Sequence, residues 1–220
     1  IIVLVIYYLI YKDSSSNLSG MNPANEEVTI DGTTLESNEN SNNYAYSIWF
    51  YVSDWQTRLT DKKTLLTRAT NDGQNNSNPL IEFSPYQNDI NITINTTSDT
   101  TTSNPSTCNI RNFPLQRWVN LIISLNGRTL DVYLDGKLIR TCILEGVPVQ
   151  VGTSDILITP GGGFAGYTSK LKFFANPLNP QQAYNIYKEG PASSNLISNL
   201  YYKYKIQVTY LVDNVEEGSF

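Results

Sequence analysis

Alternation of bulky and polar residues indicates that the chain is mostly β. From Tyr44 to Val52 every second side chain would lie on one face, with Trp49 and Tyr51 on the other, which is the period of a strand. Both faces are bulky, so we expect a central strand. Shorter apolar runs predict three further strands, at Thr64–Ala69, Leu80–Phe83 and Ile90–Ile94. The polar stretch from Asn95 to Thr107 is predicted to be a long loop.

The segment from Trp118 to Cys142 predicts three consecutive antiparallel strands. Two dipeptides that favour type I′ turns, Asn126-Gly127 and Asp135-Gly136, separate three alternating runs. In the middle run the residues expected to face the core are Leu130, Val132 and Leu134. The opposite face carries Asp131 and is therefore expected to be partly in contact with water.

One α-helix is predicted near residue 180. Asn179 is a good N-cap, Pro180 suits the first helical position, and Gln182 completes the pattern of a capping box. Gly190 followed by Pro191 is expected to end the helix. Its short apolar stripe would lie against the sheets.

The two ends of the chain have their own patterns. Residues 1–11 are apolar or aromatic throughout, but a helix of that length covers only about half of a ~30 Å hydrocarbon core. We interpret residues 1–12 as the end of a longer membrane-anchor helix, with a buried strand or a signal-peptide core as the alternatives. Residues 13–43 are polar and are expected to form a tether with an edge strand near Val28–Ile30. Alternation over Tyr201–Leu211 predicts a strand, within residues 191–220, that packs on the domain.

Composition and charge narrow the possible functions. The 15 Lys and Arg against 20 Asp and Glu leave a net charge of −5, and the charges are scattered, so we expect no nucleic-acid partner. The chain contains no His, which removes catalytic schemes that pair Ser or Cys with His. The 2 Cys residues are too few for a zinc site.

Several phrases of the sequence together resemble a known family. They are YSIWFYV, TLLTRA, RWVNLIISLNGRTLDVYLDGKLIRT, FAGYTSKLKFF and NPLNPQQAYNIYKEGP. They resemble the concanavalin A-like lectin/glucanase jelly roll of the laminin-G type, and they extend over residues 44–190. The resemblance implies that these residues form an antiparallel β-sandwich with one short helix towards its C-terminal end.

A narrower resemblance concerns the setting of the protein. NFPLQRWVNLIISLNGRTLDVYLDGKLIRTC and the segments YKEGPASSNL and YYKYKIQVTYL resemble membrane-anchored jelly-roll proteins found in the virions of large nucleocytoplasmic DNA viruses. The resemblance implies a minor capsid or virion membrane protein at the interface between an internal membrane and the shell.

The motifs favour neither catalysis nor a metal site. Glucanases of the family carry Glu-x-Asp-x-x-Glu on one strand, and the sequence lacks this motif, so we expect no enzyme activity. The resemblance makes calcium a candidate, because related domains often hold it, and the available oxygen ligands are Asp72, Asn75, Asn76 and Asp155. Their spacing matches no calcium loop, and Asp and Asn in turns usually bond their own backbone. We therefore expect no cofactor.

Five aromatic residues are candidates for contacts with glycans or with a partner protein. They are Trp49, Tyr51, Trp55, Tyr86 and Tyr133. Tyr and Trp rings stack on sugar rings and concentrate at protein interfaces, but each of these residues is equally suited to a sandwich core.

Cys108 and Cys142 are candidates for a disulfide. Cys108 precedes the first strand of the predicted three-strand segment and Cys142 ends the third, and the first and third partners of an antiparallel sheet can approach closely. Two buried thiols are the alternative.

These observations favour a non-enzymatic structural or adhesion protein. We expect a membrane-anchored jelly roll that contacts capsid or other shell proteins, located in the virion if the viral resemblance holds. The alternative is a membrane-anchored lectin that binds glycans, and a glycanase is a third and weaker reading.

Overall fold

The structure is a computed structural model that describes residues 17–35, 42–69, 77–97 and 103–191, and the backbone of two strands near the C-terminus. The expected membrane-anchor segment, residues 1–12, lies outside the described residues. Within the described part of the chain, no helix is long and apolar enough to cross a membrane.

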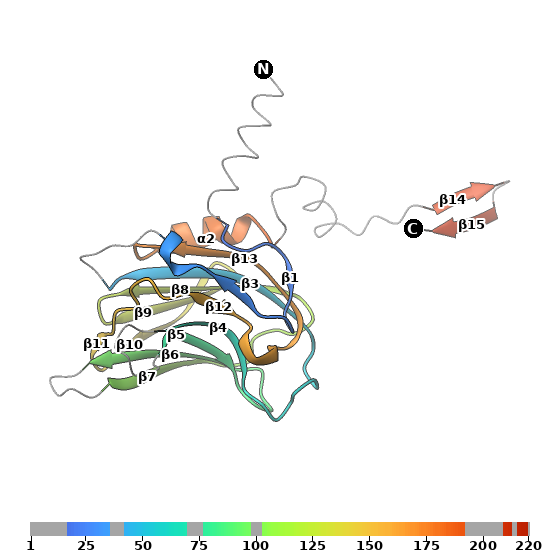
Figure 1. Ribbon diagram of the computed structural model, residues 1–220. Helices are drawn as coiled ribbons and strands as arrows, with labels where there is room; N and C mark the ends of the chain where they lie inside the picture. Colours follow the sequence, from blue (N-terminus) through green and yellow to red (C-terminus); the bar gives the residue numbers. More distant parts are fainter. Residues whose placement is uncertain are drawn as a thin grey trace, which may run out of the picture.

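Two antiparallel sheets pack face to face as a sandwich (Figure 1). The six-stranded sheet has the order β1 (Asn22–Pro23), β13 (Ala165–Phe174), β3 (Tyr44–Asp54), β8 (Trp118–Asn126), β9 (Thr129–Leu134) and β10 (Lys137–Ile143). The seven-stranded sheet has the order β11 (Val147–Pro148), β6 (Ile90–Thr97), β5 (Ser77–Phe83), β4 (Lys63–Ala69), β12 (Ile156–Ile158) and β2 (Val28–Ile30), and β7 (Ser103–Ile110) pairs with β6. This arrangement confirms the predicted antiparallel β-sandwich.

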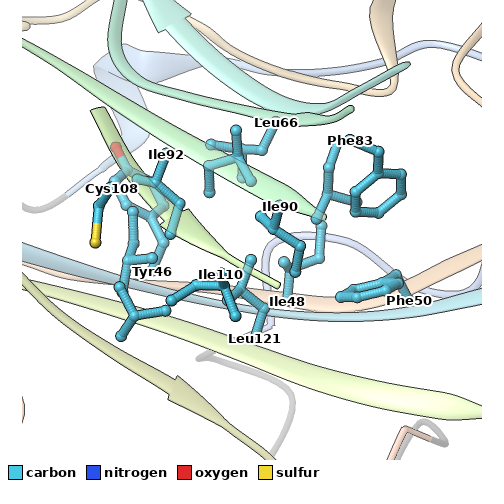
Figure 2. Packing of buried hydrophobic residues seen from close by; sticks show 14 of the residues in the cluster. Tyr46, Ile48, Phe50, Leu66, Phe83, Ile90, Ile92, Cys108, Ile110 and Leu121 are labelled. Atoms are coloured by element: carbon cyan, nitrogen blue, oxygen red, sulfur yellow. The ribbon is translucent and has the colours of Figure 1, made fainter. Parts of the chain in front are cut away.

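The main core lies between the two sheets. Ile48 and Phe50 of β3 point inward together with Leu121 of β8, and they meet Ile90 and Ile92 of β6 (Figure 2). These side chains are at most 1% exposed. Burial of such apolar area is the dominant favourable contribution to folding.

The three-strand segment forms as predicted, although one of its turns differs from the prediction. Asp135 and Gly136 both have positive φ, 50° and 72°, as a type I′ turn requires. The β8–β9 turn pairs Asn126 with Thr129, so its central residues are Gly127 and Arg128, of which only Gly127 has positive φ. It is therefore not the predicted type I′ turn centred on Asn126-Gly127.

Residues 103–110 correct the prediction of a long loop. They form β7, a strand at the edge of its sheet that pairs with β6 from Ile90↔Ile110 to Thr97↔Ser103. Polar side chains and Pro105 hid this strand in the sequence, because an edge strand tolerates both.

Helix α2 (Pro180–Lys188) has the predicted capping box. Gln182 N donates to Asn179 Oδ1, and Asn179 N donates to Gln182 Oε1, each at 2.9 Å. Ala183 and Ile186 pack against Ala45 and Ile122 on the outer face of the six-stranded sheet, where they form a second, smaller core (Figure 1).

The sandwich begins earlier than the pattern indicated. Val28–Ile30 forms β2 at a sheet edge as expected, and Asn22–Pro23 pairs with β13, so residues expected to be a tether belong to both sheets. Two 3₁₀ turns, Gly32–Thr34 and Pro160–Gly162, flank these strands in the chain.

Near the C-terminus, β14 (Thr209–Val212) pairs with β15 (Val215–Ser219) in a separate two-stranded sheet. Residues 201–208, which begin the predicted strand, lie outside the described residues. Packing of this strand on the domain stays a prediction.

Candidate binding surface

Two of the five predicted contact residues are covered by α2. Trp49 is 4% exposed and stacks on Tyr187 of α2, with ring centroids 5.7 Å apart and planes 20° apart. Tyr133 is 1% exposed and belongs to the small core beneath the helix. Because α2 packs on their face of the sheet, Trp49 and Tyr133 are interior residues, and the prediction that they contact a partner is wrong.

Beyond the helix, the same face of the sheet carries a row of aromatic rings. Tyr51 of β3 lies directly opposite Trp118 of β8 on one side and Tyr167 of β13 on the other. The Tyr51 and Trp118 ring centroids are 5.8 Å apart. Residues directly opposite on antiparallel strands share a face, so these three residues form what we call the outer aromatic row.

The outer aromatic row is accessible from solvent. Tyr167 is 46% exposed, whereas Tyr51 and Trp118 are half-buried. Pro23 of β1 is exposed and pairs with Tyr167, which extends the row to a fourth strand. At ~4.8 Å between strands, the four residues span roughly 14 Å. The row is thus a ring-lined strip on the outer face of the sheet, with the Tyr51 and Trp118 ring planes tilted by 49°.

Trp118 and Tyr167 were missed by sequence reasoning. Alternation carries the signal for Trp118, because its neighbour Val119 is buried in the core and adjacent strand residues face opposite sides. Tyr167 was hidden because no strand was predicted at residues 165–170, where β13 begins.

Trp55 and Tyr86 lie in loops at one end of the sandwich. Trp55 is half-buried and packs edge-on against Phe113, with centroids 5.6 Å apart, and against Phe83 at 6.1 Å. Tyr86 is 66% exposed, and its backbone N–H donates to Leu59 O at 2.9 Å. Of the five predicted contact residues, Tyr86 is therefore the most exposed, Tyr51 and Trp55 are half-buried, and Tyr51 and Tyr86 belong to different regions.

Lys63, the first residue of β4, is buried at this end of the sandwich. Its side chain is 0% exposed, and its Nζ lies 4.3 Å from the centroid of the Trp55 ring. Desolvation lowers the pKa of Lys63 below its ordinary value of 10.5, and the nearby charge of Arg58 lowers it further. Folding therefore disfavours the charged form of this side chain.

We predict that Lys63→Met stabilises the protein at neutral pH by about 1–3 kcal/mol, because it removes buried donors that lack an acceptor. Since the Lys63 pKa is lower in the folded state, the unfolded state binds more protons between the two pKa values, and wild-type stability rises with pH in that window. The advantage of Lys63→Met should therefore shrink as pH approaches 10.5. Urea titrations of both proteins from pH 7 to 10 measure this difference, and a gap that widens with pH would contradict it.

Several carboxylates of the described residues have structural partners. Asp54 accepts hydrogen bonds from the side chain of Thr57 and the backbone of Gln56, and these lower its pKa. Glu82 pairs with Lys62 at 3.3 Å, and Asp135 pairs with Arg117. These contacts give the carboxylates structural roles in loops and surface ion pairs.

Of the four candidate calcium ligands, the structure describes Asp155. Asp155 Oδ1 accepts a hydrogen bond from Gly32 N at 2.9 Å, which fixes it beside the first 3₁₀ turn. Asp72, Asn75 and Asn76 lie outside the described residues. Among the residues that the structure does describe, no three acidic or Cys side chains gather as metal ligands would.

Cys108 and Cys142 are joined by a disulfide, with Cα atoms 6.0 Å apart. Cys108 lies on β7 and Cys142 on β10, which are edge strands of different sheets. The bond therefore joins the two layers of the sandwich, whereas the sequence pattern predicts that both residues lie in one sheet.

The sequence places the chain in a family. Residues 23–183 match the concanavalin A-like lectin/glucanases superfamily, and the chain belongs to this family. A search of curated proteins found no match.

Similar solved structures include receptor-binding domains of botulinum neurotoxins. The domain of botulinum neurotoxin D is 12% identical with a TM-score of 0.60, and the match covers 79% of this chain and 43% of that one. The serotype G binding domain is 14% identical with a TM-score of 0.54, covering 77% and 46%. The chain thus spans less than half of these relatives, and at such identity the likeness concerns the fold alone. These neighbours are toxin domains rather than virion proteins.

Proposed function

We propose that this chain is a non-catalytic adhesion protein that binds its partner on the outer aromatic row. The observation that carries the proposal is the juxtaposition of Trp118, Tyr51 and Tyr167 on a sheet face that α2 leaves open. Tyr and Trp are the residues most enriched among those that dominate binding energy at interfaces. They combine a large apolar ring with a polar group, so the row suits a partner that is partly polar.

The setting we propose is a virion, with the chain as a minor capsid or virion membrane protein. The hydrophobic residues 1–11 support an anchor in a membrane, and the phrase-level resemblance to virion jelly-roll proteins supports shell proteins as the partners. The domain would then link the membrane to the shell by adhesion. Engagement of the carboxylates in structural contacts supports a role without catalysis.

Glycan binding is the second candidate, and the same row favours it. Flat aromatic rings stack on sugar rings, and a strip of roughly 14 Å is long enough for several contacts. The family includes lectins by name, and the similar toxin domains are described as receptor binding.

The test compares the full chain with the double variant Tyr51→Ala/Tyr167→Ala. We expect its affinity for protein shells, prepared by removing the bilayer of source particles with mild detergent, to fall at least tenfold, because truncating dominant interface residues costs about 2 kcal/mol or more. Tyr184→Ala is the matched control, since Tyr184 is a 45% exposed tyrosine on α2 outside the row.

The two candidates give different results. Shell binding that depends on the row, together with a blank array of defined glycans, supports the structural role. Row-dependent binding to a defined glycan, without shell binding, would replace it by the lectin. Equal affinity of the wild type and the double variant for both probes would show that the outer aromatic row is not the binding surface.

A further inference from the structure

Two buried hydrogen-bond donors lie beside each other at the ends of the loop of residues 55–62. They are Trp55 Nε1 and Lys63 Nζ. Lys63 Nζ and Trp55 Nε1 are both inaccessible to solvent, and neither has a hydrogen-bond partner among the described residues. The Lys63 Nζ lies 4.3 Å from the Trp55 ring centroid, so the two donors belong to one small region. Buried donors without acceptors are rare in folded proteins and need an explanation.

The neighbouring groups do not supply the missing acceptor. The face of the Trp55 ring attracts the Lys63 charge, but it offers no lone pair to the ammonium protons or to its own N–H. Asp61 is the carboxylate whose charge acts on Lys63. Its oxygens, however, already accept hydrogen bonds from Arg58 Nε at 3.2 Å and Thr60 Oγ1 at 3.0 Å. Arg58 and Lys63 together outnumber it in charge, which leaves the region electropositive.

The loop above these donors is fixed from both sides. Arg58 Nη1 donates to Gly161 O at 2.8 Å and to Gly163 O at 3.1 Å, which ties the loop to the start of β13. Leu59 O accepts from Tyr86 N at 2.9 Å, which ties it to the β5–β6 loop. Arg58 and Tyr86 hold positive φ values of 56° and 62°, conformations that persist only where surrounding contacts impose them. The donors are therefore held in place before any ligand arrives.

We infer that Lys63 and Trp55 form a binding site for a small carboxylate or a similar oxyanion. A carboxylate carries a negative charge that balances the ammonium charge. It also has two acceptor oxygens, enough for both donors. A water molecule could accept from both donors but would leave the ammonium charge unbalanced, and a cation would be repelled. Trp55 is half-buried, so part of the indole ring lies at the surface, although both donor atoms are covered. The site lies at the loop end of the sandwich and is independent of the outer aromatic row.

The Trp55 indole proton provides a direct probe. The chain has 3 Trp, so a ¹H–¹⁵N spectrum of the full chain shows few indole signals, and Trp55→Phe assigns the one of interest. We expect titration with sodium formate, at ionic strength held constant with sodium chloride, to give a saturable downfield shift of this signal. The Trp49 and Trp118 signals should not move, since neither residue belongs to the site.

Matched lysine variants separate the site from general charge effects. Lys63→Met should weaken formate binding at least about tenfold, because a hydrogen bond to a charged group is lost. Lys62→Met removes the same charge one residue earlier, from a side chain 66% exposed, and should leave the affinity within about twofold. Lys63→Gln, which keeps a donor but no charge, should give an intermediate affinity and serves if Lys63→Met folds poorly.

Three results would overturn the inference. They are a Trp55 signal that formate does not move, a shift that grows without saturating, and equal affinities in the Lys63 variants and the wild type. In the first case the donors are satisfied by water alone.

Discussion

Replacing Phe83 with Ala is expected to lower the free energy of unfolding by about 3–5 kcal/mol, the usual cost of truncating a buried aromatic side chain. Phe83 is 0% exposed and lies at the centre of a ring cluster at the loop end of the core. Its ring contacts Phe113 at 4.7 Å, Phe164 at 5.1 Å and Phe50 at 5.2 Å between centroids. These partners come from different strands and loops, so no single segment can move to fill the cavity.

Urea denaturation followed by tryptophan fluorescence measures this effect, because Trp55 packs on Phe83. Phe83→Leu keeps most of the volume and should cost less than about 1.5 kcal/mol. Tyr86→Ala, three residues along and 66% exposed, should change stability by no more than about 0.5 kcal/mol. A Phe83→Ala variant within 1 kcal/mol of the wild type would show that the loop end collapses onto the space.

The parts of the fold that could be predicted are those encoded by local sequence. Alternation assigned the faces of β3 correctly, because Tyr46, Ile48 and Phe50 recur at every second position and pack in the main core. The N-cap of α2 and the Asp135-Gly136 turn were predicted because each depends on the chemistry of a few adjacent residues.

The parts that could not be predicted depend on which surfaces meet. Trp49 and Tyr133 look like exposed aromatics in the sequence, and only the docking of α2 on their face buries them. Lys63 follows Lys62 in a polar turn, and nothing local shows that the first is covered by Trp55 while its neighbour stays exposed. The outer aromatic row requires the register of three strands, which alternation within one strand cannot supply.

The pairing of Cys108 with Cys142 also depends on how the two sheets meet, and its loss should have a large effect on stability. Replacing both with Ser is expected to lower the free energy of unfolding by about 3–4 kcal/mol, because the bond closes a loop of 34 residues in the unfolded chain. The edge strands β7 and β10 would then be joined by weaker links. These include Arg140 Nη1 donating to Asn109 O at 2.7 Å and Glu145 N donating to Ser106 Oγ at 3.2 Å.

Because the bond acts largely on the unfolded chain, reduction of the wild type should have the same effect as the double variant. Urea titrations of the oxidised wild type, the dithiothreitol-treated wild type and Cys108→Ser/Cys142→Ser should therefore give one stable and two equally weakened proteins. Addition of dithiothreitol to the double variant is the control and should change nothing. If the double variant were as stable as the oxidised protein, the hydrogen bonds between the two edges would suffice to hold the sheets together. Since the outer aromatic row lies on β8, β3 and β13 rather than on the joined edges, binding through the row should survive loss of the disulfide under conditions where the chain stays folded.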